Sequence, residues 1–306
     1  MRGLFVAWAT ALLVAVTCSA WAQQAPSQAD RVAAIRRAAA ELKPQTGSFS
    51  LADGVARFEA RKLAYLSPDD TRKLLVDIWG NPPNVAQGNL GALVPQGFDA
   101  LSDSDWAIIM FYTEDGHVAD DDAEKIDYAD LLKSMQQSVR DQNEERRKEG
   151  FEDLELVGWA RPPYYDKAAH KLHWAKHLRS VGGDSLNYNV RMLGRRGVLV
   201  LNFVAPMESL RQVENAIPSV LAEVNFTDGN RYDQYEPGND KLAEYGIAAL
   251  IAGVALKKVG FFAVIIGFIL AAKKIFIVGA VAVLAGFARF FRRLGRGSRL
   301  PPPTGS

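Results

Sequence analysis

The stretch LNYNVRMLGRRGVLVLNFV, residues 186–204, predicts two strands joined by a short turn. Its halves, 186–193 and 198–204, are rich in residues that favour strands, and the GRRG segment between them has a glycine at each end. A connection this short joins neighbouring antiparallel strands. The middle of the chain is therefore predicted to form a β-hairpin.

Similar patterns extend the prediction to both sides of this hairpin. Further strands are predicted within 48–60, where Ala52-Asp53-Gly54 marks a turn, and at 106–112, 154–159 and 171–178. Helices are predicted at 27–42, 67–78, after the acidic triplet at 120–122, and from 206 to 224 with a kink or break at Pro218. Hairpins separated by single helices indicate an α+β domain with a mainly antiparallel sheet and flanking helices.

The N-terminal residues 1–22 are expected to be a signal peptide. Arg2 precedes an apolar run of 13 residues at 4–16, and Ala20-Trp21-Ala22 follows as a cleavage pattern. The run is short for a membrane crossing. Lipidation at Cys18, the only cysteine, stays open as an alternative, although Thr17 fits a lipidation motif poorly. Cleavage after Ala22 would remove that cysteine, which would exclude disulfides and cysteine-ligated zinc.

Residues 242–291 are predicted to form a C-terminal transmembrane region. Two lysine pairs in this apolar run are sixteen residues apart, which is about 24 Å along a helix and close to the thickness of a bilayer core. Long basic side chains are tolerated at the membrane surface and not in its centre. The expected membrane-boundary residues are Lys257, Lys258, Lys273, Lys274, Arg292 and Arg293.

One crossing is favoured over a hairpin of two crossings. A single crossing leaves the basic, proline-rich tail at 292–306 in the cytoplasm, as the positive-inside rule prefers. The exported domain then comprises residues 23–241 and lies in the periplasm. The formal charge of +1 combines this acidic domain with a basic C-terminal region, so a nucleic-acid partner is not expected.

Three histidines in the segment HKLHWAKHL, residues 170–178, are the first candidates for chemistry. His170, His173 and His177 would share one face of a helix. The segment alternates like a strand, however, and this places His173 and His177 together on a face expected to be solvated. We therefore predict no metal site and no cofactor.

The acidic triplet Asp120, Asp121 and Asp122 is expected to cap the helix that follows it. The chain contains no nucleophile elbow, phosphate-binding loop or dinucleotide motif, and no catalytic residue is predicted. An envelope hydrolase with a dispersed site stays open as an alternative. It would combine the triplet with His117 or with the three clustered histidines.

Corners rich in aromatic residues and proline are the preferred candidates for a partner surface. Tyrosine and tryptophan suit contact surfaces because they offer a large area at a low entropy cost. Two of the corners contain Pro82-Pro83 and Pro162-Pro163, and a third precedes Pro237. The candidate partner-surface residues are Trp79, Trp159, Tyr164, Tyr165, Tyr232 and Tyr235.

Several of these segments together resemble one known family. The ordered set LLVDIWGNPP, EDGHVADDDAEKIDYADLL, LNYNVRMLGRRGVLVLN and RYDQYEPGNDKLAEYGIAALIAG resembles the DUF2167 family of uncharacterised bacterial proteins, over about residues 48–293. The resemblance implies an exported, membrane-anchored protein of a Gram-negative bacterium. It implies no reaction and no catalytic residues.

The function expected from the sequence is that of a membrane-tethered envelope protein with a non-catalytic binding or adaptor domain. The expected location is the bacterial inner membrane, and the expected partners are membrane lipid and another envelope protein. The alternatives are the hydrolase described above and an accessory subunit of a membrane transporter. The oligomeric state is not predicted.

Overall fold

The computed structural model describes residues 27–102 and 105–253, and strands β4 and β8 lie in the middle of its sheet. In this part of the chain nine strands form one antiparallel sheet in the order β1-β2-β3-β4-β8-β7-β6-β5, with β9 paired to β2. The strands are β1 Gln45–Leu51, β2 Ala56–Leu66, β3 Asn89–Pro95, β4 Ala107–Thr113, β5 Glu155–Asp166, β6 Lys171–Ser180, β7 Gly183–Leu193, β8 Val198–Pro206 and β9 Val224–Phe226.

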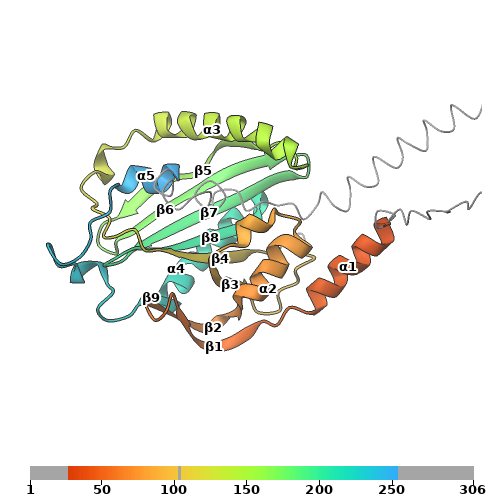
Figure 1. Cartoon of the computed structure of the whole chain (residues 1–306), viewed down its shortest axis with the longest axis horizontal. Coiled ribbons are helices and arrows are strands. Elements are labelled where there is room, and N and C mark those ends of the chain that lie inside the picture. The colour runs from red at the N-terminus through yellow and green to blue at the C-terminus, as the bar shows by residue number, and fades with distance from the viewer. Residues whose placement is uncertain (1–26, 103–104, 254–306) are drawn as a thin grey trace, which may run out of the picture.

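Helices cover both faces of this sheet (Figure 1). The helices are α1 Gln28–Ala40, α2 Pro68–Arg72 with the π-helical turn η1 Lys73–Ile78, α3 Tyr128–Lys148, α4 Leu210–Glu223 and α5 Ile247–Ala252. Short 3₁₀ turns are η2 Pro83–Ala86, η3 Ala123–Lys125, η4 Met207–Ser209 and η5 Tyr232–Gln234. One face packs on α4, and the other packs on η1, α3 and α5. We call them the α4 face and the α5 face.

The predicted central hairpin is confirmed. Leu193 pairs with Val198, and the Gly194 N–H donates to the Gly197 carbonyl at 2.8 Å. Alternate residues supply two separate cores, with Val200 on the α5 face and Leu199 and Leu201 on the α4 face. Both strands are buried almost throughout because the sheet is covered on both sides.

Gly197 allows the turn of this hairpin to lie close to β4. A Cβ atom at Gly197 would collide with the Thr113 carbonyl oxygen and with the Tyr112 ring. We expect Gly197→Ala to lower the free energy of unfolding by about 1–3 kcal/mol, since overpacking forces the backbone to shift. Urea denaturation measures this loss.

Gly158→Ala in β5 is the matched control for that substitution. Among the described residues, no heavy atom lies within 4 Å of a Cβ placed at Gly158. Its free energy of unfolding should stay within about 0.5 kcal/mol of the wild-type value. If both variants lost the same stability, the contact of Gly197 with β4 would not be the reason that alanine is destabilising at position 197.

Other predicted elements are confirmed with small changes. The hairpin of β1 and β2 turns at Ala52 and Asp53, both at positive φ. The Ser67 hydroxyl accepts from the Asp70 N–H and caps α2, with Pro68 as the first helical residue. Pro218 lies inside α4 and does not divide it.

Two strands, β3 and β9, were not predicted. Helix α5 lies at the beginning of the segment expected to be the membrane anchor. A further difference concerns β5, which continues to Asp166 through the segment expected to be a corner at Pro162-Pro163. The turn that follows instead spans residues 167–170 and ends at His170, which has a φ of 50°.

No helix in the described ranges is long and apolar enough to cross a membrane. The expected signal peptide at 1–22, the tail at 292–306 and all six boundary residues lie outside those ranges. Of the predicted anchor, residues 242–253 are described, and they pack against the domain. Ile247, Leu250 and Ile251 of α5 are buried in the core of the α5 face.

Candidate functional site

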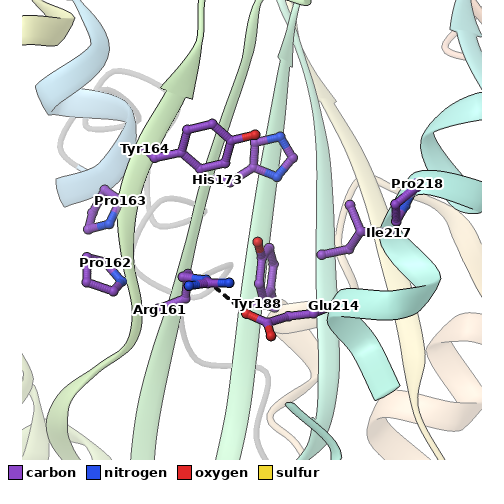
Figure 2. A pocket seen from close by; sticks show the side chains of 9 residues that line it. All are labelled: Arg161, Pro162, Pro163, Tyr164, His173, Tyr188, Glu214, Ile217 and Pro218. Atoms are coloured by element: carbon purple, nitrogen blue, oxygen red, sulfur yellow. Dashed lines mark ion pairs between the residues drawn. The ribbon is translucent and has the colours of Figure 1, made fainter. Parts of the chain in front are cut away.

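A groove of about 450 Å³ lies on the α4 face, between α4 and the strand β5 at the edge of the sheet. Figure 2 shows its side chains converging from β5, β6, β7 and α4. The lining residues are Arg161, Pro162, Pro163, Tyr164, His173, Tyr188, Glu214, Ile217 and Pro218.

The geometry of β5 places Tyr164 in this groove. The pairing of β5 with β6 shifts register between Trp159 and Arg161, and again between Arg161 and Tyr164. Pro162 and Pro163 lie in the second shift. Proline cannot donate a ladder hydrogen bond, so an edge strand with a local irregularity is where a sheet tolerates it.

Aromatic rings form one wall of the groove. Tyr164 pairs with His173 across the strands, and their rings stack with centroids 5.0 Å apart. His173 meets Tyr188 edge-on at 6.5 Å, and Tyr188 meets the buried Phe203 at 6.0 Å. Tyr164 is 51% exposed, whereas His173 is 4% exposed. The wall therefore runs from the surface into the core of the α4 face.

An ion pair joins β5 to α4 at one end of the groove. The Arg161 Nε lies 2.9 Å from the Glu214 Oε1, as the dashed line in Figure 2 marks. The Arg161 side chain is 55% exposed and that of Glu214 is 26% exposed. Exposed pairs of this kind contribute about 1 kcal/mol or less to stability. Because both side chains are partly exposed, the charges of Arg161 and Glu214 can orient a bound group.

His173 and Tyr188 are uncharged at neutral pH. Burial lowers the pKa of His173 to about 4, although Asp166 opposes the change. Burial, with Glu214 nearby, raises the pKa of Tyr188 to about 12. A histidine whose pKa is about 4 is a weak base at pH 7. The groove is suited to holding an apolar or aromatic group beside a pair of opposite charges.

A second cluster of rings lies where the segment after β9 folds back on the sheet. Tyr232 packs between His117 and His170, with ring centroids 4.2 Å and 4.0 Å away. Tyr235 stacks on His117 at 3.9 Å. The Tyr165 hydroxyl lies 3.2 Å from the His170 Nδ1. We call these five residues the histidine–tyrosine cluster.

This cluster brings together some residues of the hydrolase alternative. The Tyr165 hydroxyl donates to Asp120 at 2.8 Å, and His170 lies 3.7 Å from the same carboxylate. Burial and Asp120 raise the pKa of Tyr165 above its ordinary range, and burial lowers that of His117. A tyrosine with a raised pKa is a poor nucleophile. These contacts therefore do not assemble an activated nucleophile.

Hydrogen bonds and ion pairs give the cluster a structural role. The Tyr232 hydroxyl donates to the Val118 carbonyl at 2.9 Å. Arg195, in the turn of the central hairpin, pairs with Asp240 at 2.6 Å and with Glu236 at 3.1 Å. The cluster and these ion pairs together fasten residues 231–243 to the end of the sheet.

The three clustered histidines diverge in the structure. His170 lies in the cluster, His173 lies in the groove, and His177 pairs with Asp184 at 2.7 Å near the other end of β6. The described residues contain no group of three or more potential ligands that could hold a metal ion. The expectation that His173 lies on a solvated face is wrong, because α4 and Tyr164 cover that face.

The acidic triplet does not cap α3. Asp127 caps that helix by accepting from the N–H groups of Ala129 and Asp130, since the turn η3 intervenes after the triplet. The Asp122 carboxylate instead accepts from the Ile247 N–H at 3.0 Å, at the beginning of α5. Asp122 therefore accepts a hydrogen bond at a helix N-terminus, as expected for the triplet, but the helix is α5, which begins 125 residues further along the chain.

The predicted partner-surface residues are dispersed. Trp79 is 1% exposed and lies in the core of the α5 face, so it is not a surface residue. Trp159 is half-buried and donates to the Tyr128 carbonyl at 3.3 Å. Tyr165, Tyr232 and Tyr235 belong to the histidine–tyrosine cluster. Tyr164 lines the groove.

Most groove residues were not singled out from the sequence. Arg161, Tyr188, Glu214 and Ile217 come from three separate elements. They meet only because β5 shifts register and α4 crosses the α4 face beside it. No spacing along the chain signals this meeting.

Comparisons with known proteins agree with the family resemblance. The sequence model of a family described as "Protein of unknown function (DUF2167)" matches residues 43–284. No curated protein matches the chain. The solution structure of cyanobacterial PsbP (CyanoP) from Synechocystis sp. PCC 6803 is similar at 9% identity and a TM-score of 0.33, covering 60% of this chain and 94% of that one. At this level of similarity nothing is transferred from it.

Proposed function

Because the chain belongs to the DUF2167 family, whose description assigns no function, we propose its function from the groove and from the sequence. We propose that it is a membrane-anchored protein of the bacterial envelope and that its α+β domain, facing the periplasm, binds another envelope protein. The signal-peptide pattern at 1–22 and the apolar run at 254–293 support this location. The inner membrane is the proposed site of the anchor.

The groove on the α4 face supports the binding role. It presents an exposed tyrosine, a neutral aromatic wall and an ion pair within one concave surface. Contact surfaces are enriched in tyrosine and arginine, and concave apolar sites with a few polar groups hold ligands. We propose that a partner inserts an apolar or aromatic side chain beside Tyr164 and His173, and that Arg161 and Glu214 orient polar groups around it.

Photocrosslinking in cells tests this proposal. A benzophenone amino acid replaces Tyr164 in the full chain, and a second strain carries it at Lys133 on the exposed side of α3. We expect one reproducible protein adduct from position 164, about tenfold more abundant than any from position 133, and weakened when Arg161→Ala is added, because a hot-spot contact contributes 1 kcal/mol or more. Equal adducts from both positions, or lipid adducts alone, would refute binding at the groove.

The two alternatives predict other results. A transporter subunit would yield an adduct to a polytopic membrane protein. A hydrolase using Asp120 would lose a measurable activity in Asp120→Asn while the domain stays folded, and adducts at the groove would be unaffected.

A further inference from the structure

A row of polar side chains lies buried on the α5 face, opposite the groove. It consists of Lys176 in β6, Asn187, Asn189 and Arg191 in β7, and Asn202 in β8. Their exposed fractions are 5%, 1%, 0%, 6% and 0% in that order. Lys176 pairs with Asn187, and Asn189 pairs with Asn202, so the side chains are neighbours across three strands. We call them the buried cation row.

Hydrogen bonds within the row occupy its side-chain acceptors. The Arg191 guanidinium donates to Asn202 Oδ1 at 3.1 Å and to Asn189 Oδ1 at 3.5 Å. The Asn189 amide donates to Asn187 Oδ1 at 2.9 Å. Each of the three asparagines thus has its carbonyl oxygen engaged by a donor.

Two buried donors beside this network are unused. The Asn187 Nδ2 has no hydrogen-bond partner among the described residues, and neither does the Trp174 Nε1. Trp174 lies directly against the row, since the Arg191 guanidinium sits 4.8 Å from the centroid of its ring. A buried donor without a partner costs about 1–3 kcal/mol. Two such donors on the same face of the neighbouring strands β6 and β7 favour an acceptor that completes the site.

The charge of the row points to the same conclusion. Burial, and then the neighbouring charge of Arg191, lowers the pKa of Lys176 to about 7, so that the ammonium is about half protonated at neutral pH and a bound anion would favour its charged form. The contacts of the Arg191 guanidinium are with neutral oxygens and a tryptophan ring. It forms no ion pair with any described carboxylate. A cation buried beside another cation is stabilised when an anion joins it.

From these contacts we propose that the buried cation row is a binding site for a phosphate group, either free in solution or in a lipid headgroup. Two cations and two unused donors match an anion with several acceptor oxygens and more than one negative charge. A phosphate has that character, whereas a single carboxylate has two oxygens and one charge. The Asn187 and Trp174 N–H groups and the Lys176 ammonium would donate to its oxygens, and Arg191 would supply the second charge. This site is separate from the groove, so either proposal can fail without the other.

Titration of the full-length protein in detergent with inorganic phosphate tests the site, with chloride at matched ionic strength as the salt control. We expect a saturable change in tryptophan fluorescence and a rise in Tm of about 5–10 °C at about one hundred times Kd. Lys176→Met should weaken the affinity by about tenfold or more, because it removes a charged hydrogen-bond donor. Lys133→Met, which removes an exposed lysine on α3, should leave the affinity unchanged.

A second titration uses dihexanoyl phosphatidic acid, a soluble lipid whose headgroup is a phosphate. Saturable binding of this lipid alone assigns the site to a headgroup, and binding of inorganic phosphate alone assigns it to a free ion. Should Lys176→Met fail to fold, Asn187→Leu removes an unused donor at constant charge and should also weaken binding. The proposal is overturned if neither titrant gives a saturable response, or if Lys133→Met weakens binding as much as Lys176→Met.

Discussion

Replacing Trp79 by alanine is expected to lower the free energy of unfolding by about 3–5 kcal/mol, the usual cost of truncating a buried tryptophan. The Trp79 side chain is 1% exposed and packs in the core of the α5 face, and its Nε1 donates to the Ala100 carbonyl at 3.4 Å. The substitution therefore removes a large apolar surface and leaves a cavity. Chemical denaturation followed by circular dichroism measures the loss.

Tyr164→Ala is the control, because it removes another predicted partner-surface residue from an exposed position. Its cost should be about 1 kcal/mol or less, because the Tyr164 side chain is half exposed. If the two variants were equally stable, Trp79 would not support the core, and it would again be a candidate for the partner surface.

Acidification should destabilise the protein through His173. The unfolded chain binds a proton at this residue near pH 6.5, whereas burial lowers the pKa in the folded protein to about 4. Between these values the unfolded state holds more protons, so the free energy of unfolding falls as the pH is lowered from 6.5 to 4. The contribution is fully present above pH 6.5. The difference between the two pKa values corresponds to about 3 kcal/mol.

The free energy of unfolding measured between pH 7.5 and pH 4 in the wild type and in His173→Gln isolates this contribution, since other titrating groups are common to both proteins. The wild type should lose about 3 kcal/mol more than the variant over this range. If the free energy of unfolding depended on pH in the same way in both proteins, His173 would be solvated, as the strand pattern alone suggested. The aromatic wall described for the groove would then be wrong.

Local signals in the sequence were sufficient for most elements of the fold. The glycines at 194 and 197, the cap at Ser67 and the turn at Ala52-Asp53 each specify a structure within a few residues. Strand β3 was missed although four of its residues are buried. It pairs with β2 and β4, which are distant enough along the chain that no short-range signal identifies it.

The candidate sites were harder to predict because they depend on which faces of the sheet are covered. Residues 187, 189 and 191 alternate with apolar neighbours, a pattern that usually places polar side chains in solvent. Here both faces are covered, so the same alternation buries Arg191 on one face and Tyr188 on the other. Tyr164 could be singled out by its composition, but its neighbours Glu214 and Ile217 arrive from a helix about fifty residues further on.

Pro162 and Pro163 also decide how this domain can associate. A free sheet edge invites another chain to add a strand through backbone hydrogen bonds, which is a common route to fibres and to strand-exchange complexes. Two successive residues without an N–H group interrupt that ladder on β5, beside the groove. A partner on this side must therefore be recognised by its side chains, and its affinity should be sensitive to its sequence. At the other end of the strand order, β1 has no such interruption and can accept an added strand.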